Sequence, residues 1–532
     1  MVELVDAEDS KSSAARHVGS SPTGGTRLAL GAEGLVPGAE APHLQQTRLS
    51  IALPALAIAL IVALRIWFDL ATPPMGDEAY YWIWGQRLGW SYFDHPPLDA
   101  WLQAGVAAIF GWSRVSLRLL TWLSFAATLA VLWLMGRELR PAQSGAAWSV
   151  RTMLVLQTVP VVAIFAMPAF HDHLLVLFSV ASIYCFWRFA IRQKDGQGGI
   201  GSLFATALLL GLATLAKYNG ALVGVGYAAA LLTSPALRPA LRTPHPYLAA
   251  LLAVAVQAPV IYWNLTDGLA TLSFHFVERP SGHWTRPDLH QGLFFVLFGV
   301  AAAGPFLLLG ALRLLRVRLE RREALLVAIA GNVFIASTLI MFGLSLFTDV
   351  LLHWNIVAYV ALALTGAWAL GRWLFWPHVL VTLYLLTAAV IGYSHPPGML
   401  PGFTDPGAEA NFGWPEVGRV VSAAEQQHPG AFLAATKYNY AAQLSFALHR
   451  LDVTAINPLR SQYDLWWTAA DHIGQDAIIV ADRTNPISLS SGHFHSVSKL
   501  ADVPVMHDGR QIWMFEVYLG EGYQVTDTGG GT

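Results

Sequence analysis

Two short motifs bring acidic, histidine and aromatic side chains together just after the first apolar stretch of the chain. The first motif contains Asp77 and Glu78, and the second contains Asp94 and His95. Ionisable groups at a membrane boundary are costly unless they have partners or a function. A carboxylate here could act as a general base that takes a proton from an attacking hydroxyl while a leaving group departs. The aromatic rings around it could stack on a sugar or an isoprenoid.

Each motif also has a structural interpretation. Acidic residues favour helix N-termini, so Asp77 and Glu78 could cap a helix that begins after two prolines. His95, which precedes two further prolines, could belong to a rigid turn. A helix cap does not require the second acid and the histidine. The two motifs together therefore favour a site that faces a substrate.

Further ionisable residues lie at the ends of later apolar stretches. His171, Asp172 and His173 form a cluster, but two histidines two positions apart on a helix point to different faces and would bind zinc poorly. Asp172 is better interpreted as a charge partner. Lys217, which precedes Tyr218, could extend to the membrane interface, neutralise a phosphate or hold Asp172.

The composition is that of an integral membrane protein. Of the 532 residues, 55% are hydrophobic and only 12% are charged, whereas soluble domains carry about 25% charged residues. The mean hydropathy is +0.48. A formal net charge of −2 argues against a nucleic-acid partner, which would require a basic face. The single cysteine, Cys185, excludes an internal disulfide.

Apolar stretches predict a membrane domain of about eleven and up to thirteen spans. We expect the eleven at 49–70, 115–136, 148–168, 171–190, 201–217, 220–234, 247–264, 291–312, 324–347, 350–370 and 376–393. The turn between the third and fourth stretches is very short. That region could therefore be a broken or re-entrant element.

Charge bias predicts the orientation of these spans. Arginines gather in alternate loops, above all in the run from Arg313 to Arg322, and such loops are usually cytoplasmic. We therefore expect a cytoplasmic N-terminus. The acids, histidines and aromatics singled out above, together with His353, then all lie at the outer ends of spans. This shared side favours one site.

Three regions follow from these patterns. Residues 1–48 are polar, small and aperiodic, and we expect a disordered cytoplasmic tail. Residues 49–393 form the membrane domain, with a catalytic first outer loop at 71–114. Residues 395–532 lack long apolar stretches and predict a small α/β domain in the periplasm. Its expected elements are strands at 431–436, 476–480 and 511–517 and an amphipathic helix at 440–449.

Taken in order along the chain, these motifs resemble the bacterial lipid-linked-sugar glycosyltransferases of the GT-C fold. The branch is that of the aminoarabinose–lipid A transferases and the relatives of protein O-mannosyltransferases. The resemblance covers about residues 49–520. The segments that carry it are Asp77–Tyr81, Tyr92–Leu98, Asp172, Ala216–Tyr218, His353–Asn355 and Ser461–Trp466.

The resemblance implies transfer of a sugar from a polyprenyl-phosphate donor to a lipid or glycan acceptor, such as lipopolysaccharide or lipid A, at the outer face of the inner membrane. It implies an inverting reaction with Asp77 as the base, and Glu78 and Asp172 as further catalytic residues. The residues expected to bind the donor phosphate are Lys217, Tyr218, Tyr80 and Tyr81. Those expected to bind substrate are Asp94, His95, His171, His353, Asn355, Gln462 and Tyr463.

The chain departs from the family pattern at three of these positions. Tyr80 replaces the usual arginine of the Asp-Glu-x-Arg-Tyr motif, and Asp94 and His95 stand where aminoarabinose transferases carry a glutamate and a lysine. These differences weaken the transfer of phosphate-binding roles. Gln462 and Tyr463 lie in a predicted loop that could either hang over the site, where it would contact a sugar, or pack as an ordinary surface loop.

No cofactor is required by any motif, and neither a Gly-x-Gly-x-x-Gly sequence after a strand nor a Walker motif is present. Asp94 and His95 could hold a divalent metal ion together with His275 and His283 of a later loop. A protein O-glycosyltransferase is an alternative function. A transporter or flippase of lipid-linked sugars is an alternative of another class, although carriers usually show internal repeats and midplane charges.

Overall fold

The computed structural model describes residues 42–140, 142–267, 269, 287–396 and 405–525. The chain divides into two units, residues 1–46 and 47–532. Of the first unit, only the helical backbone of residues 42–46 is described. The first helix thus begins at Pro42, earlier than the expected start at residue 49, and proline is well suited to the first position of a helix.

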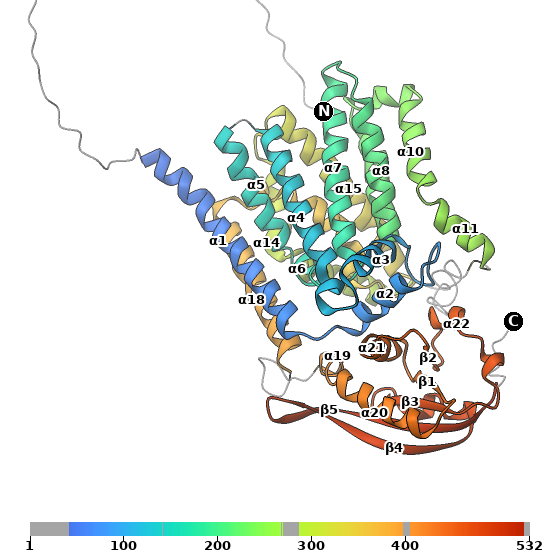
Figure 1. The fold of residues 1–532 in the computed structure, drawn as a ribbon. Helices are drawn as coiled ribbons and strands as arrows, with labels where there is room; N and C mark the ends of the chain where they lie inside the picture. Colours follow the sequence, from blue (N-terminus) through green and yellow to red (C-terminus); the bar gives the residue numbers. More distant parts are fainter. Residues whose placement is uncertain (1–41, 141, 268, 270–286, 397–404, 526–532) are drawn as a thin grey trace, which may run out of the picture. The chain divides into compact units, whose positions relative to one another are not determined.

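Long helices form the membrane part of the second unit (Figure 1). Five described helices are long and apolar enough to cross a membrane: α1 (Pro42–Ala71), α4 (Arg114–Leu139), α7 (Asp172–Lys194), α15 (Arg321–Ser345) and α18 (Gly371–Ser394). Two bent pairs raise the number to seven: α10 (His245–Ala255) with α11 (Ala258–Thr266), and α13 (Leu289–Ala303) with α14 (Pro305–Ala311) and η4 (Leu312–Leu315). The chain is therefore a multi-pass membrane protein.

The expected count of eleven spans is not confirmed, although each of the eleven predicted stretches coincides with a helix or a broken series of helices. The reason is length. Helix α9 (Ala221–Thr233) has 13 residues and α8 (Ile200–Ala216) has 17. A helix rises 1.5 Å per residue, so α9 is only about 20 Å long, against a hydrocarbon core of about 30 Å.

Two further predicted stretches are interrupted. The third stretch divides into α5 (Ala142–Gln157) and α6 (Pro160–Phe165), because Pro160 has no N–H to donate to the preceding turn. This break lies inside the third stretch, and a broken or re-entrant element at the turn before the fourth stretch stays a prediction. The tenth stretch consists of the short helices η5 (Leu352–Asn355), α16 (Ile356–Ala363) and α17 (Gly366–Ala369).

Two helices of the first outer loop lie between the membrane helices and the C-terminal sheet (Figure 1). They are α2 (Gly76–Gln86) and α3 (Leu98–Phe110). Helix α2 packs against α3 on one side and on the other against α21 (Tyr438–Leu448) of the C-terminal region. Ala79 and Trp82 of α2 share a hydrophobic core with Val417 and Leu433 of that region. The predicted first outer loop is therefore folded together with the C-terminal domain.

The C-terminal region contains a five-stranded sheet in the order β2-β1-β3-β5-β4. The strands are β1 (Phe432–Ala435), β2 (Val453–Ala455), β3 (Ala477–Asp482), β4 (Phe494–His507) and β5 (Arg510–Tyr523). Strands β2, β1 and β3 are parallel, and β5 runs antiparallel to both β3 and β4. The three predicted strands and the predicted helix are confirmed. Strand β2 was missed because it has three residues, and β4 because most of its side chains are exposed.

Short helices complete the outer domain and the connections. They are α19 (Pro406–Glu409), α20 (Trp414–Gln427), α22 (Tyr463–Trp466), η1 (Tyr218–Gly220), η2 (Arg238–Arg242), η6 (Ala469–His472), η7 (Ile487–Leu489) and η8 (Ser491–His493). Helix α20 is strongly amphipathic and buries Trp414, Val417 and Val421 against the sheet. Its buried side chains recur at three- and four-residue spacing, as expected for a helix with one apolar face.

A glycine sets the distance between two membrane helices. A Cβ at Gly226 of α9 would lie 2.4 Å from the Cα of Val333 of α15, so the two backbones are in direct contact. Small residues permit such close approach between helices in a membrane.

Replacing Gly226 with alanine is expected to lower the Tm of the purified protein, because the added methyl group would push α9 away from α15. Gly331→Ala is the matched control: Gly331 also lies in a helix, and a Cβ there would have no neighbour within 4 Å. That control should keep or raise the Tm, since alanine has the higher helix propensity by about 1 kcal/mol. Equal effects of the two substitutions on Tm would contradict close packing at Gly226.

Candidate active site

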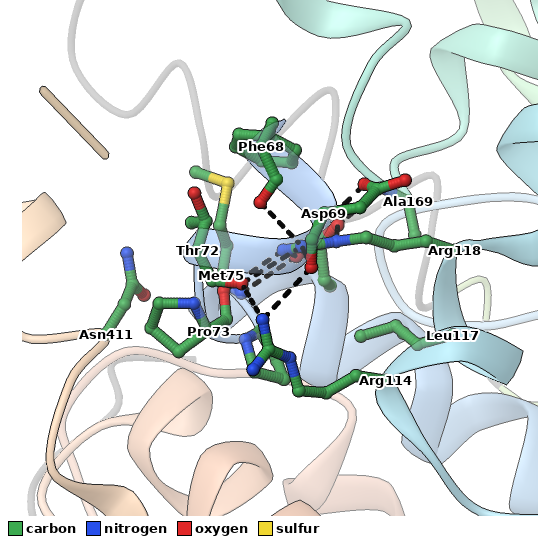
Figure 2. Close-up of polar contacts among 12 residues, drawn as sticks. Phe68, Asp69, Thr72, Pro73, Met75, Arg114, Leu117, Arg118, Ala169 and Asn411 are labelled. Atoms are coloured by element: carbon green, nitrogen blue, oxygen red, sulfur yellow. Dashed lines mark hydrogen bonds and ion pairs between the residues drawn. The ribbon is translucent and has the colours of Figure 1, made fainter. Parts of the chain in front are cut away.

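Two arginines of α4 hold the C-terminal end of α1 (Figure 2). Arg118 donates to the carbonyl of Thr72 through Nη1 at 3.0 Å and to that of Pro73 through Nη2 at 3.0 Å. Arg114, one turn earlier, donates through Nη2 to the carbonyls of Asp69, Leu70 and Thr72. The last carbonyls of a helix lack partners within the helix and carry partial negative charge, so cations satisfy and stabilise them.

Arg118 also forms a buried ion pair with Glu78 of α2. Its Nη2 lies 2.6 Å from Glu78 Oε2, and its Nε donates to Oε1 at 2.9 Å. The backbone N–H of Ala169 donates to Oε1 at 2.8 Å, and that of Met75 donates to Oε2 at 2.9 Å. Glu78 is fully buried. The capping interpretation is therefore confirmed for Glu78, and its carboxylate is occupied in joining α1, α2, α4 and the segment before α7.

Amide side chains of the outer domain hold the segment between α1 and α2. Gln443 donates through Nε2 to the carbonyl of Pro74 at 2.6 Å, and the N–H of Gly76 donates to Asn411 Oδ1 at 3.0 Å. A Cβ at Gly76 would lie 2.8 Å from Asn439 Nδ2, so only glycine fits between the two parts of the chain. The start of α2 is thus fixed from both sides.

Asp77, next to Glu78 in sequence, has a different environment. It is half-buried and accepts a hydrogen bond from Tyr438 Oη at 3.1 Å. Within the described residues it forms no ion pair. Burial raises the pKa of Asp77 above its usual value, while the hydrogen bond from Tyr438 and the charge of Lys437 act in the opposite direction. Asp77 is therefore a carboxylate with unused acceptor capacity and enhanced basicity.

Aromatic and imidazole rings lie one helical turn beyond Asp77. Tyr81, four residues later on the same face of α2, has its ring centroid 4.2 Å from that of His171 and 5.6 Å from that of His95. The rings of His95 and His171 are 4.4 Å apart. Burial, helped by the charge of Lys217, lowers the pKa of His171 well below its usual value, so His171 is neutral at physiological pH.

The negative charge of Asp94 acts on two tyrosines of α2. Burial and then the charge of Asp94 raise the pKa of Tyr80, and burial followed by the charges of Asp77 and Asp94 raises that of Tyr81. Both phenols therefore keep their protons. The two motifs, separate in sequence, thus lie close together around Tyr81.

Asp172 and Lys217 form a second buried ion pair. Lys217 Nζ donates to both carboxylate oxygens of Asp172, at 2.9 and 2.8 Å. The pair joins the start of α7 to the residue that follows α8. Of the open interpretations of Lys217, the structure shows the one in which it holds Asp172. The neighbouring Tyr218 packs in a small apolar cluster with Leu98 and Leu174.

The loop that precedes α22 packs into the first outer loop. Gln462 accepts a hydrogen bond from the N–H of Phe93 at 2.7 Å through Oε1, and its own N–H donates to Tyr80 Oη at 2.8 Å. The ring of Tyr463 stacks on that of Tyr80 at 6.0 Å. Gln462 and Tyr463 are 3% and 2% exposed, so both faces are occupied by protein. The loop is thus buried against the first outer loop rather than lying free on the surface, and substrate contact by these two residues stays a prediction.

Two of the predicted substrate-binding residues lie among membrane helices. The ring of His353 stacks on Phe165 of α6 at 4.4 Å. Asn355 is fully buried, accepts a hydrogen bond from Ser337 Oγ at 2.7 Å and donates one to Thr338 Oγ1 at 3.1 Å. This network joins Asn355 to α15. A role of either residue in substrate binding stays a prediction.

The predicted metal site is only partly described. His275 and His283 lie outside the described residues. Within the described part of the chain, no group of three or more His, Cys, Asp or Glu residues is arranged to hold a metal ion. Metal binding by Asp94, His95 and the two later histidines therefore stays a prediction.

Sequence analysis missed several residues that shape the site. Arg118 carried a signal, because an arginine inside an apolar stretch is costly without a partner. Asn411, Tyr438 and Gln443 carried none, since amides and tyrosines are common on soluble domains.

Replacing Arg118 with methionine is expected to destabilise the protein strongly, because Glu78 would stay buried without its cation. Loss of one partner of a buried pair costs about 3–5 kcal/mol. Adding Glu78→Gln to Arg118→Met should recover part of the Tm loss, since the buried charge is then removed. Arg419→Met is the control, because the ion pair of Arg419 with Glu416 is exposed. A double variant no more stable than Arg118→Met would contradict the pairing.

Comparisons with known proteins show what the chain resembles. Residues 94–263 match the family described as dolichyl-phosphate-mannose-protein mannosyltransferase. The chain is 29% identical over 338 residues to the lipid A galacturonosyltransferase RgtD of Rhizobium johnstonii, which covers 61% of this chain and 67% of that protein.

Superposition on solved structures identifies the fold of the chain. ArnT from Cupriavidus metallidurans bound to undecaprenyl phosphate superimposes with a TM-score of 0.57 at 16% identity, over 87% of this chain and 97% of ArnT. ArnT in its apo state gives a TM-score of 0.59 over the same shares. The chain therefore has the GT-C fold and resembles ArnT and the related bacterial glycosyltransferases.

Proposed function

We propose that the chain is an inverting glycosyltransferase that moves a sugar from a polyprenyl-phosphate donor to a lipid acceptor, such as lipid A, at the outer face of the bacterial inner membrane. Asp77 is the catalytic base in this proposal. The relative RgtD is named for lipid A, and one ArnT structure contains undecaprenyl phosphate. These names support an acceptor and a donor of those classes.

The contrast between two adjacent carboxylates carries the proposal. Glu78 is saturated by Arg118 and two backbone N–H groups, whereas Asp77 accepts one hydrogen bond from Tyr438. A general base needs a free lone pair within reach of the proton that it removes, and its strength rises with its pKa. Asp77 meets both conditions, whereas the carboxylate oxygens of Glu78 are already engaged by Arg118 and two backbone N–H groups.

A polar cavity next to Asp77 suits an acceptor with hydroxyl groups. It has a volume of about 260 Å³ and is lined by Gly76, Lys437, Asn439, Gln443 and Asn485, among others. Amide side chains both donate and accept hydrogen bonds, as a sugar hydroxyl does. Tyr438, which bonds Asp77, lies between two lining residues in sequence. The cavity thus lies next in sequence to both Asp77 and its partner Tyr438, which supports it as the acceptor site of this proposal.

In this proposal the donor lies beside Tyr81, His95 and His171, whose rings are close together. Tyr81 keeps its phenol proton and His171 is neutral, so both can hydrogen-bond to a phosphate or sugar. The Asp172–Lys217 pair acts as a positioning pair that fixes the segment carrying His171. Asp94 and His95 complete the proposed donor site.

The proposed reaction forms one bond, breaks one bond and moves one proton, and no cofactor takes part in it. Asp77 takes the proton of the acceptor hydroxyl, whose oxygen bonds to the anomeric carbon. The bond between that carbon and the phosphate oxygen breaks, and polyprenyl phosphate leaves with the electron pair. Attack from the side opposite the leaving group inverts the configuration at the anomeric carbon. Holding base, acceptor and donor in line supplies most of the acceleration.

A protein acceptor is the second candidate, favoured by the family match over residues 94–263. The two functions differ in product. Mass spectrometry of cells with and without the chain would find the added sugar on a glycolipid in the first case and on a protein in the second. A sugar found only on protein would replace the lipid acceptor while leaving the role of Asp77 intact.

Asp77→Asn is expected to reduce sugar transfer by at least about 100-fold, because general base catalysis contributes roughly 10²–10⁴ in rate. The substitution keeps the shape of the side chain, so Tm should be unchanged. Transfer is measured with reconstituted protein, polyprenyl-phosphate sugar and lipid A. Asp471→Asn, which alters an exposed acid of the outer domain, is the control and should retain full activity. Near-normal turnover by Asp77→Asn would eliminate Asp77 as the base.

Tyr438→Phe is expected to shift the acid limb of the kcat/KM profile to higher pH. The base works as a carboxylate, so activity falls as pH drops through its pKa. The hydrogen bond from Tyr438 lowers that pKa, and its removal therefore raises the pKa. Tyr384→Phe, at an exposed tyrosine of α18, is the control. An unchanged or lowered acid limb in Tyr438→Phe would contradict this assignment.

A further inference from the structure

An apolar pocket opens between four membrane helices, away from the candidate active site. Helices α7, α8, α9 and α10 enclose about 370 Å³. Phe186, Ala207 and Tyr227 form a buried floor, while Ala228 and Tyr247 stand exposed at the rim. Helices α7, α8 and α10 are neighbours in Figure 1. The pocket therefore opens outward from the helix bundle.

The floor of the pocket is apolar, because its few polar side chains are hydrogen-bonded within the protein. Tyr227 donates its hydroxyl proton to Ser182 Oγ at 2.9 Å, and Thr206 donates to the carbonyl of Ser202 at 2.8 Å. The polar atoms at the floor are thus satisfied within the protein. The volume is more than twice that of a cavity of about 150 Å³ that accommodates benzene. A segment of hydrocarbon chain fits a space of this size and chemistry.

Positive charge lies at one edge of the pocket. Arg238 and Arg242 flank the lining residue Leu241 in η2, and both side chains are exposed. No Asp or Glu occurs in residues 196–266. Arg238 Nε donates to the carbonyl of Leu232 at 3.1 Å, and in the part of the chain that the structure covers neither arginine pairs with a carboxylate. The edge therefore has uncompensated positive charge beside an apolar hollow.

We propose that this pocket binds an anionic phospholipid of the surrounding membrane, with an acyl chain against Tyr227 and the headgroup phosphate at Arg238 and Arg242. The apolar pocket suits the acyl chain of such a lipid, and the two arginines suit its phosphate. A zwitterionic lipid would fill the hollow equally well but would gain less from the arginines, since each basic residue near a membrane surface favours anionic lipid.

The bound lipid would also brace the helix that leads to the candidate site. Leu203, Ala207 and Leu210 of α8 line the pocket, and α8 ends one residue before Lys217. Tyr247 of α10 is tied to η2 by a hydrogen bond to the carbonyl of Leu241 at 3.0 Å. An acyl chain between α8 and α10 would fill the space into which α8 could otherwise move. This inference does not depend on the proposed reaction.

The test is retention of lipid by the full-length protein, measured by native mass spectrometry after exchange from nanodiscs of phosphatidylglycerol or phosphatidylcholine. The wild type should retain phosphatidylglycerol in preference to phosphatidylcholine and gain Tm from it. Arg238→Gln with Arg242→Gln should weaken phosphatidylglycerol binding roughly 30-fold, because two basic contacts are lost. Ala228→Phe, which fills the rim, should abolish retention of either lipid.

Matched controls separate the pocket from general lipid contact. Arg318→Gln removes an exposed arginine elsewhere, and Ala126→Phe enlarges an exposed alanine of α4; neither should change retention. Equal retention of the two lipids, or unchanged retention in Ala228→Phe, would overturn the proposal. A dimer that Ala228→Phe abolishes would assign the pocket to a second copy and would likewise overturn it.

Discussion

The ion pair between Arg118 and Glu78 is the interaction on which the candidate site depends. Burying two charges costs several kcal/mol per ion, and here four hydrogen bonds to Glu78 and two backbone carbonyls bound by Arg118 offset that cost. The pair fixes the rotation of α2 about its axis. Successive residues on a helix differ by about 100°, so an inward Glu78 directs Asp77 to another side of α2, where it meets Tyr438. Glu78 thereby takes the contacts with Arg118, and Asp77 keeps acceptor capacity beyond its hydrogen bond from Tyr438.

Hydropathy predicted where most membrane helices lie, because an apolar stretch has few alternatives in a bilayer. It could not predict how many cross, since that depends on breaks such as the one at Pro160 and on short helices such as α9. In the outer domain, the buried strands β1 and β3 were evident from their continuous apolar residues. The exposed edge strand β4 lacks that pattern, because one face and one edge have no protein to pack against.

The candidate site residues that could be predicted from the sequence are those whose charge is unusual beside an apolar stretch. Asp77, Asp172 and Lys217 are conspicuous because acids and lysines are rare beside apolar helices, and the pairing of Asp172 with Lys217 follows from opposite charge. The remaining contacts are long-range hydrogen bonds between ordinary residues. Gln462 and Tyr463 lie beside the first outer loop, as expected, but tertiary packing buries them against Tyr80. Single-sequence patterns do not encode such pairings.

The amide clamp on the start of α2 has a consequence for the order of synthesis. Gly76 bonds Asn411, which lies 335 residues later in the chain. At about 5–20 residues per second, a ribosome needs roughly 20–70 seconds to make that interval. During this time the first outer loop exists without the side chains that fix it. Until Asn411 has been made, a growing polypeptide therefore holds Asp77 in a loop whose long-range contacts have not yet formed.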